Sequence, residues 1–258
     1  VTVAFFALAG FIFLITQYFQ FLKGYGPLET GVRLLPVATS VAVASILGTQ
    51  LAVRFGSKFI VGGGLVTLSV AYAWVSTSDV GTSYLEIAGQ MILLGSGMGL
   101  TSAPATESIM GSVSDAKAGI GSAVNDTTRE LGGTLGVAVI GSVFVSIYQD
   151  VFSGASVRGI PEAALDPARE SIGGALLAAQ ALVEAGAPGA AQSLGQVASD
   201  GFIDGLQAGC LVASAVCAVG AIICFIFLPA QPQAEPGVEA MTATEAAQAD
   251  PVPVGAGR

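Results

Sequence analysis

The sequence contains no histidine, and this absence argues against several classes of function at once. Histidine is the commonest metal-ligating side chain and a frequent general base. Serine and cysteine nucleophiles are commonly activated by an adjacent histidine base. We therefore expect a protein that is not an enzyme and that has neither a metal site nor an organic cofactor.

Charged side chains are also scarce: they make up 10% of the 258 residues, whereas 53% of the residues are hydrophobic. A soluble domain carries about 25% charged residues. The net charge of −9 arises mainly in two polar segments, 149–202 and 230–258, and no segment forms the basic face that nucleic-acid binding needs. This composition indicates a membrane protein without a nucleic-acid partner.

Only three cysteines are present, at positions 210, 217 and 224. A spacing of seven puts them on one stripe of a helix, about 10 Å apart along its axis. That distance is too long for a disulfide bond or a shared metal ion. We interpret Cys210, Cys217 and Cys224 as small packing residues.

The apolar residues gather into blocks that are long enough to cross a bilayer, which takes about 20 helical residues. None of the blocks alternates between apolar and polar residues as the strands of a membrane barrel do. The sequence therefore predicts an all-α membrane protein with six transmembrane helices, at approximately 1–22, 34–53, 59–78, 87–106, 131–148 and 206–228.

The domain organisation follows from these spans. We expect five helices within 1–148, an extracytoplasmic loop at 149–205 with short surface helices, a last helix at 206–229 and a disordered tail at 230–258. Because apolar residues begin at once after Val1, which is not an initiator methionine, we expect the sequence to start inside a longer protein.

Polar side chains within the spans are the natural functional candidates, because they are expensive at membrane depth. On an ideal helix, Phe6, Phe13, Gln17 and Gln20 share one face. This stripe either contacts an amphipathic organic molecule or hydrogen-bonds neighbouring helices. Gln90, in the fourth span, is a further candidate for the substrate cavity.

Glycines in the later spans indicate close helix packing, since small residues four apart let backbones approach. This set comprises Gly95, Gly99, Gly132 and Gly136.

A charged cluster precedes the fifth span, in a helix that we expect to begin near Ala118. Asp126, Arg129 and Glu130 have the spacing for pairing on one helical face. The cluster, together with Asn125, forms either a salt-bridged helix end or a gate latch that pairs differently in two conformations.

Three stretches of the sequence together carry a family resemblance. The first runs from Gln17-Tyr18-Phe19-Gln20 to Leu35-Pro36; the second comprises Gly48, Leu51, Arg54, Gly56 and Lys58; the third joins the glycines at 95, 97 and 99 to Asn125, Arg129 and Gly132-Gly133. In these residues the sequence resembles the carboxyl-terminal part of the fourteen-helix drug:proton antiporter branch (EmrB/QacA-like) of the major facilitator superfamily. Val53 departs from the pattern, because the fuller loop signature has an aspartate there.

The resemblance implies that the six spans are helices nine to fourteen and form the carboxyl-terminal bundle of a major facilitator fold. The first, second, fourth and fifth spans would line the central cavity. Arg54, Gly56 and Lys58 would belong to a cytoplasmic gating loop, with Asn125, Asp126 and Arg129 as further gating candidates.

The implied function is proton-coupled export of amphipathic organic compounds by alternating access, in the plasma membrane of a bacterium. The expected partners are the lipid bilayer, an amphipathic substrate and the missing amino-terminal helices, which would also carry the proton-coupling acids. Two alternatives remain open: an exporter of one metabolite, siderophore or antibiotic, and a non-transporting membrane subunit or remnant of a split gene.

Overall fold

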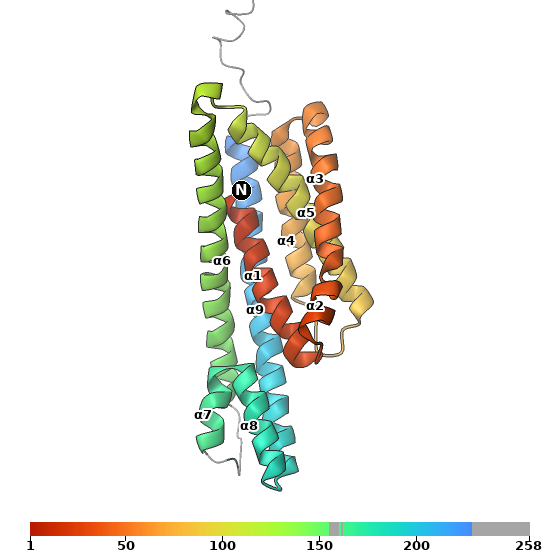
Figure 1. Cartoon of the computed structure of the whole chain (residues 1–258), viewed down its shortest axis with the longest axis vertical. Coiled ribbons are helices and arrows are strands. Elements are labelled where there is room, and N and C mark those ends of the chain that lie inside the picture. Colours follow the sequence, from red (N-terminus) through yellow and green to blue (C-terminus); the bar gives the residue numbers. More distant parts are fainter. Residues whose placement is uncertain (155–159, 161, 229–258) are drawn as a thin grey trace, which may run out of the picture.

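The computed structural model describes residues 1–154, 160 and 162–228, and all regular secondary structure within these ranges is helical (Figure 1). The tail expected at 230–258 lies outside the described residues. The helices are α1 (Thr2–Gln17), a π-helical turn η1 (Tyr18–Leu22), α2 (Pro27–Arg33), α3 (Leu35–Phe55), α4 (Ser57–Val75), α5 (Tyr84–Met110), a 3₁₀ turn η2 (Asp115–Lys117), α6 (Ala118–Gly154), α7 (Glu162–Glu170), α8 (Ile172–Glu184) and α9 (Pro188–Phe227).

Five of the helical segments in the described chain are long and apolar enough to cross a membrane: Thr2–Leu22, Pro27–Phe55, Ser57–Val75, Ala118–Ser153 and Pro188–Phe227. These correspond to five of the six predicted spans. The sixth, predicted at 87–106, lies in α5, which has 27 residues. Glycine, serine and glutamine dilute its apolar character, although its length of about 40 Å suffices to cross a bilayer.

The short connections contain residues that suit turns and helix starts. Gly56 has a φ of 89° between α3 and α4, a conformation that favours glycine. Pro27 begins α2, where its missing N–H costs no helical hydrogen bond. The hydroxyl of Ser83 accepts a hydrogen bond from the Glu86 amide and so caps α5. α6 begins at the predicted residue, Ala118.

The six long helices form a bundle of two linked groups. α1 packs against α6 and α9, while α5 packs between α3 and α4, and α4 packs against α9 to join the groups. In Figure 1, α1, α3 and α6 lie nearest the viewer, with α4 farther away and α9 passing behind α1. One broad face of the bundle is thus formed by α6, α1 and α3.

The glycines of α5 lie where its neighbours come closest. A Cβ atom added at Gly99 would lie 2.6 Å from the Val41 carbonyl oxygen of α3. One added at Gly97 would lie 2.8 Å from the Leu68 backbone nitrogen of α4. Both distances are shorter than normal packing permits, so α5 contacts both neighbours through bare backbone.

Gly132 and Gly136 of α6 lie against α1 in the same way. A Cβ at Gly132 would collide with the Thr2 carbonyl oxygen, and one at Gly136 would collide with that of Phe6. Gly95 lies close to Ser40 and the Val37 carbonyl oxygen of α3. Each of the four predicted packing glycines therefore lies at a backbone approach between two helices.

The segment expected as a loop at 149–205 is helical over much of its length. α6 continues to Gly154, and α9 already begins at Pro188, so 189–197 is the first part of α9 and not a separate surface helix. The reason is burial: Leu194, Ala198 and Phe202 recur at helical spacing and are buried. Proline at position 188 starts a helix here and does not interrupt one.

The three cysteines are free thiols on α9, and Cys210 and Cys217 are buried among apolar residues. Their positions agree with a role in packing.

Candidate functional site

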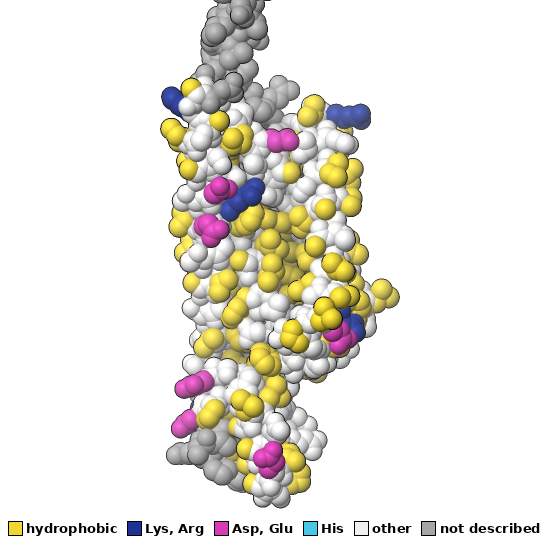
Figure 2. All heavy atoms as spheres, in the orientation of Figure 1, with side chains coloured by type: hydrophobic (Ala, Val, Ile, Leu, Met, Phe, Trp, Pro, Cys, Tyr) yellow, Lys and Arg dark blue, Asp and Glu magenta, His cyan; other side chains and the backbone are white. Residues whose placement is uncertain are grey.

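The broad face formed by α6, α1 and α3 is apolar across its middle (Figure 2). Acidic and basic side chains gather toward its two ends, and a central band of this face shows neither. A distribution of this kind fits a surface at the depth of the bilayer core, where charged groups are costly.

A polar cluster lies where α6 meets α5 and α1. Nη2 of Arg129 donates a hydrogen bond to the Thr106 hydroxyl oxygen at 3.0 Å, and that hydroxyl lies 2.9 Å from the Ser102 carbonyl oxygen. The Arg129 guanidinium also lies 5.1 Å from the centre of the Phe5 ring, within the range of a cation–π interaction. Three helices thus meet at one side chain.

Asn125, one helical turn before Arg129, completes the polar cluster. It is buried, and its Oδ1 atom lies 3.4 Å from the Thr106 hydroxyl oxygen. The Nε atom of Arg129 is buried and has no hydrogen-bond partner. The cluster therefore holds one positive charge with an unused donor.

The predicted salt-bridged helix end is wrong for Arg129. In the part of the chain that the structure describes, the ion pairs are Glu29–Arg33 and Asp166–Arg169. Asp126 and Glu130 remain exposed, whereas Arg129 turns into the contact with α5. Correct spacing along α6 was not enough, because a neighbouring helix offered the arginine another acceptor.

The structure does not put the four residues of the α1 stripe in one environment. Phe6 is buried, Phe13 and Gln17 are half-buried, and Gln20 is exposed. The Gln17 amide donates to the Phe13 carbonyl oxygen at 3.2 Å. The π-helical turn begins at Tyr18, just after Gln17, and its i→i+5 bonding breaks the ideal periodicity on which the stripe depended.

Gln90 lies in the core near the start of α5. Its side-chain nitrogen donates to the Ser78 hydroxyl at 2.9 Å, and the residue is 2% exposed. Gln90 therefore connects α5 to the turn that follows α4, and its amide is buried, away from the surface of the bundle.

The cytoplasmic-loop candidates lie at the junction of α3 and α4. Arg54 is exposed and Lys58 is half-buried, on either side of the left-handed Gly56. The Lys58 carbonyl oxygen accepts a weak hydrogen bond from Cys224 at 3.7 Å, which connects this junction to the end of α9. Their gating role stays a prediction.

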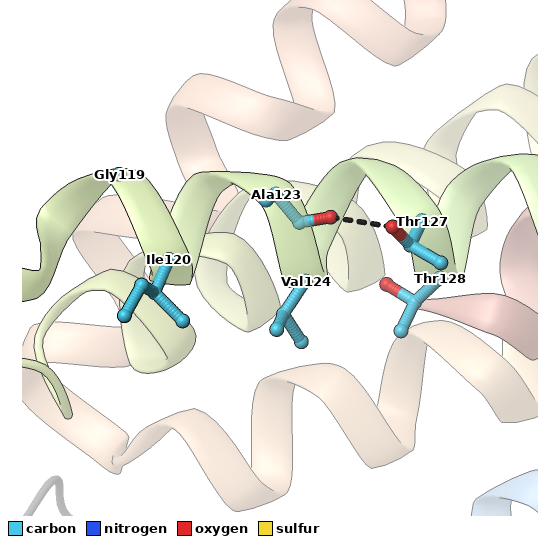
Figure 3. A pocket seen from close by; sticks show the side chains of 6 residues that line it. All are labelled: Gly119, Ile120, Ala123, Val124, Thr127 and Thr128. Atoms are coloured by element: carbon cyan, nitrogen blue, oxygen red, sulfur yellow. Dashed lines mark hydrogen bonds between the residues drawn. The ribbon is translucent and has the colours of Figure 1, made fainter.

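A shallow hollow of about 390 Å³ runs along α6 before the polar cluster (Figure 3). Its wall comes from this one helix, and within it the Thr127 hydroxyl donates to the Ala123 carbonyl oxygen at 2.7 Å. Ile120 and Val124 expose most of their side chains here. A larger cavity of about 750 Å³ lies where α1 begins and α9 ends, and Val3, Leu65 and Ile223 are among its apolar lining residues.

The end of the bundle where α4 ends and α5 begins carries two cationic contacts that the sequence did not predict. Nζ of Lys23 donates to the carbonyl oxygens of Val80 and Thr82 at 2.8 and 2.9 Å, and the Tyr18 hydroxyl donates to that of Asp79 at 2.8 Å. These bonds fix the α4–α5 turn to the end of α1. The only hint in the sequence was the nearness of Tyr18 and Lys23 to each other.

Arg33 forms the second cationic contact. Its guanidinium lies 4.0 Å from the ring centre of Tyr25 and 4.7 Å from that of Tyr84, and it pairs with Glu29. Because Tyr84 is the first residue of α5, this contact fixes α2 to the start of α5.

Comparison with known proteins identifies the family. Residues 1–137 match the model of the Major Facilitator Superfamily. The chain belongs to this superfamily. As a major facilitator protein it is a multi-pass membrane protein of a transporter family, and its all-α architecture with several apolar spans is that of the fold.

Among its major facilitator relatives are named drug-resistance proteins. The chain is 32% identical over 169 residues to the multidrug efflux pump LfrA of Mycolicibacterium smegmatis, covering 65% of this chain and 33% of the relative. It is 31% identical over 226 residues to the multidrug resistance protein Stp of Mycobacterium tuberculosis, covering 83% and 40%.

A third relative is the tetracenomycin C resistance and export protein of Streptomyces glaucescens, 30% identical over 239 residues, covering 88% of this chain and 42% of the relative. This chain thus spans about a third to two fifths of the length of these relatives.

Proposed function

We propose that this chain is the carboxyl-terminal half of a proton-coupled multidrug exporter of the fourteen-helix drug:proton antiporter branch. Its six long helices would be the last six of the fourteen, and the broad face of α6, α1 and α3 would form one wall of the substrate cavity. The exporter would act by alternating access in a bacterial plasma membrane.

The observation that carries this proposal is the match to resistance and efflux proteins along most of the chain, which reaches 83% for Stp and 88% for the tetracenomycin C exporter. The apolar middle of the broad face is a second support, because amphipathic organic compounds bind through apolar and aromatic surface. Gln20, which is exposed in the π-helical turn after α1, would supply an adaptable hydrogen bond.

Proton coupling is expected to depend on helices outside this chain. Glu86 and Glu107 lie near the two ends of α5 and are exposed, so neither is a buried proton carrier in this structure. The acids that exchange protons during transport would then belong to the amino-terminal half, together with the opposite cavity wall.

The test is dye extrusion in a bacterial host that lacks its own efflux pumps. The full-length protein that contains this chain should extrude ethidium, and a protonophore should abolish the extrusion. Residues 1–258 alone should accumulate in the membrane without extruding the dye. Proton-dependent extrusion by residues 1–258 alone would show that one half suffices, and no extrusion by the full-length protein would contradict export of this class.

Export of one particular antibiotic is a second candidate, favoured by the high coverage of the tetracenomycin C relative. The two candidate functions differ in the range of compounds that are exported. A panel of chemically unrelated compounds separates them, since a multidrug exporter raises resistance to several and a dedicated exporter to one.

A further inference from the structure

We propose that Arg129 binds a single carboxylate group, and that this group does not come from the residues that surround Arg129 in this structure. This inference rests on the proposed export function and names an anchoring contact within it. The supporting observations are the arginine's hydrogen bonds, its charge and its position.

The side chains that contact the guanidinium, Thr106 and Phe5, are neutral. Nη2 donates to Thr106, the planar group lies over the Phe5 ring, and the buried Nε has no acceptor. Among the described residues no acidic group lies within 4.0 Å of Arg129. A buried donor without an acceptor is unfavourable, and hydrogen bonds from charged donors are the stronger ones.

A carboxylate fits this arrangement better than a neutral acceptor does. Its two oxygens match the fork of guanidinium donors, so one oxygen accepts from Nε while the charge is neutralised. Thr106 of α5 accepts from the guanidinium, and Asn125 lies within hydrogen-bond distance of Thr106. The site is thus oriented before the anion arrives.

The position of Arg129 puts the site on the cytoplasmic side of the proposed cavity. Arg129 lies eleven residues after the start of α6, while Phe5 is close to the start of α1 and Thr106 to the end of α5. Near these helix ends a carboxylate has two sources: the opposing half of the same protein, or an exported compound that carries a carboxylate.

The experiment compares export of rhodamine B, which carries a carboxylate, with export of its ethyl ester, which does not. The full-length protein is tested with Arg129→Gln, Arg129→Lys and the control Arg169→Gln, whose arginine lies on α7 in an exposed ion pair. Wild-type extrusion of the ester establishes that the exporter works, so a failure of the proposed function is recognised separately.

We expect Arg129→Gln to reduce export at least tenfold and Arg129→Lys, which keeps the charge but lacks the Nε donor, to reduce it less. Loss restricted to rhodamine B assigns the carboxylate to the substrate. Equal loss for both dyes, restored when one acidic residue outside residues 1–258 is changed to its amide, assigns it to the protein itself.

Unchanged export by Arg129→Gln would overturn the proposal. So would an equal loss for both dyes that no amide substitution restores. If Arg129→Gln fails to accumulate in the membrane, the export rate of Arg129→Lys is the test. A rate equal to that of the wild type would overturn the proposal, because lysine lacks the Nε donor.

Discussion

At the scale of single residues, Gln90 and Gln20 show how the same side chain serves different ends. Gln90 is buried and its amide hydrogen-bonds to Ser78. Gln20 is exposed in the π-helical turn that follows α1. Both were expected to line the cavity, and only Gln20 has access to a ligand in this structure.

This contrast predicts opposite outcomes for two alanine substitutions. Gln90→Ala should lower the free energy of unfolding by about 1–3 kcal/mol, because it leaves the buried Ser78 hydroxyl without its partner. Gln20→Ala should change stability by no more than about 0.5 kcal/mol yet alter the relative resistance to different drugs. Thermal unfolding in detergent and a resistance panel measure the two effects, and an unaltered panel for Gln20→Ala would remove Gln20 as a contact.

At the scale of elements, the junction of α3 and α5 depends on glycine. A Cβ at Gly99 would lie 2.6 Å from the Val41 carbonyl oxygen, whereas one at Gly63 of α4 would have nothing within 4 Å. Gly99→Ala should therefore destabilise the protein by about 1–3 kcal/mol through overpacking. Gly63→Ala serves as the matched control and should be neutral or stabilising by up to about 1 kcal/mol. Equal melting temperatures for the two variants would contradict this account.

The turn between α4 and α5 is held by hydrogen bonds from Lys23, and this contribution can be tested. Lys23→Met removes the ammonium donor of the Val80 and Thr82 carbonyl oxygens. Hydrogen bonds to charged groups contribute about 1.5–3 kcal/mol, so amide hydrogen exchange at 76–83 should accelerate at least about tenfold. Lys117→Met, at the other end of the bundle, should leave this exchange unchanged. An equal rate in both variants would show that Lys23 does not hold the turn.

The element boundaries show what the sequence alone can predict. The start of α6 at Ala118 and the turn at Gly56 follow from local chemistry, and the structure has both. The π-helical turn at Tyr18 and the contact of Arg129 with Thr106 depend on neighbouring helices, so residue spacing could not reveal them. The sequence predicted only a short surface helix near 189–197, whereas the structure has one continuous helix from Pro188, in which Leu194 and Phe202 are buried at helical spacing.

At the scale of the whole molecule, the beginning of α1 and the end of α9 lie at the same end of the bundle, since Val1 and Leu228 line one cavity. The α7–α8 hairpin lies at the opposite end in Figure 1. Because an even number of spans returns the chain to the side on which it started, Val1 and Leu228 should face one side of the membrane and the α7–α8 hairpin the other.

A reporter experiment tests this orientation. Alkaline phosphatase, which is active outside the cytoplasm, should be active when inserted after Glu184 of α8. Green fluorescent protein fused after the end of the chain should fluoresce, because that end is expected in the cytoplasm. Inactive phosphatase at Glu184 would reverse the assignment.

The continuous length of α9 has a mechanical consequence. Its first 18 residues, Pro188 to Gly205, precede the predicted last span and extend about 27 Å at 1.5 Å per residue. This part of α9 is a rigid extension of the last span. If α9 tilts by about 10°, a rotation of the size seen in rigid-body transitions, the far end of the extension moves by about 5 Å. A spin label on α8, which packs against α9, would therefore magnify rocking movements of the bundle that are too small to follow at the membrane centre.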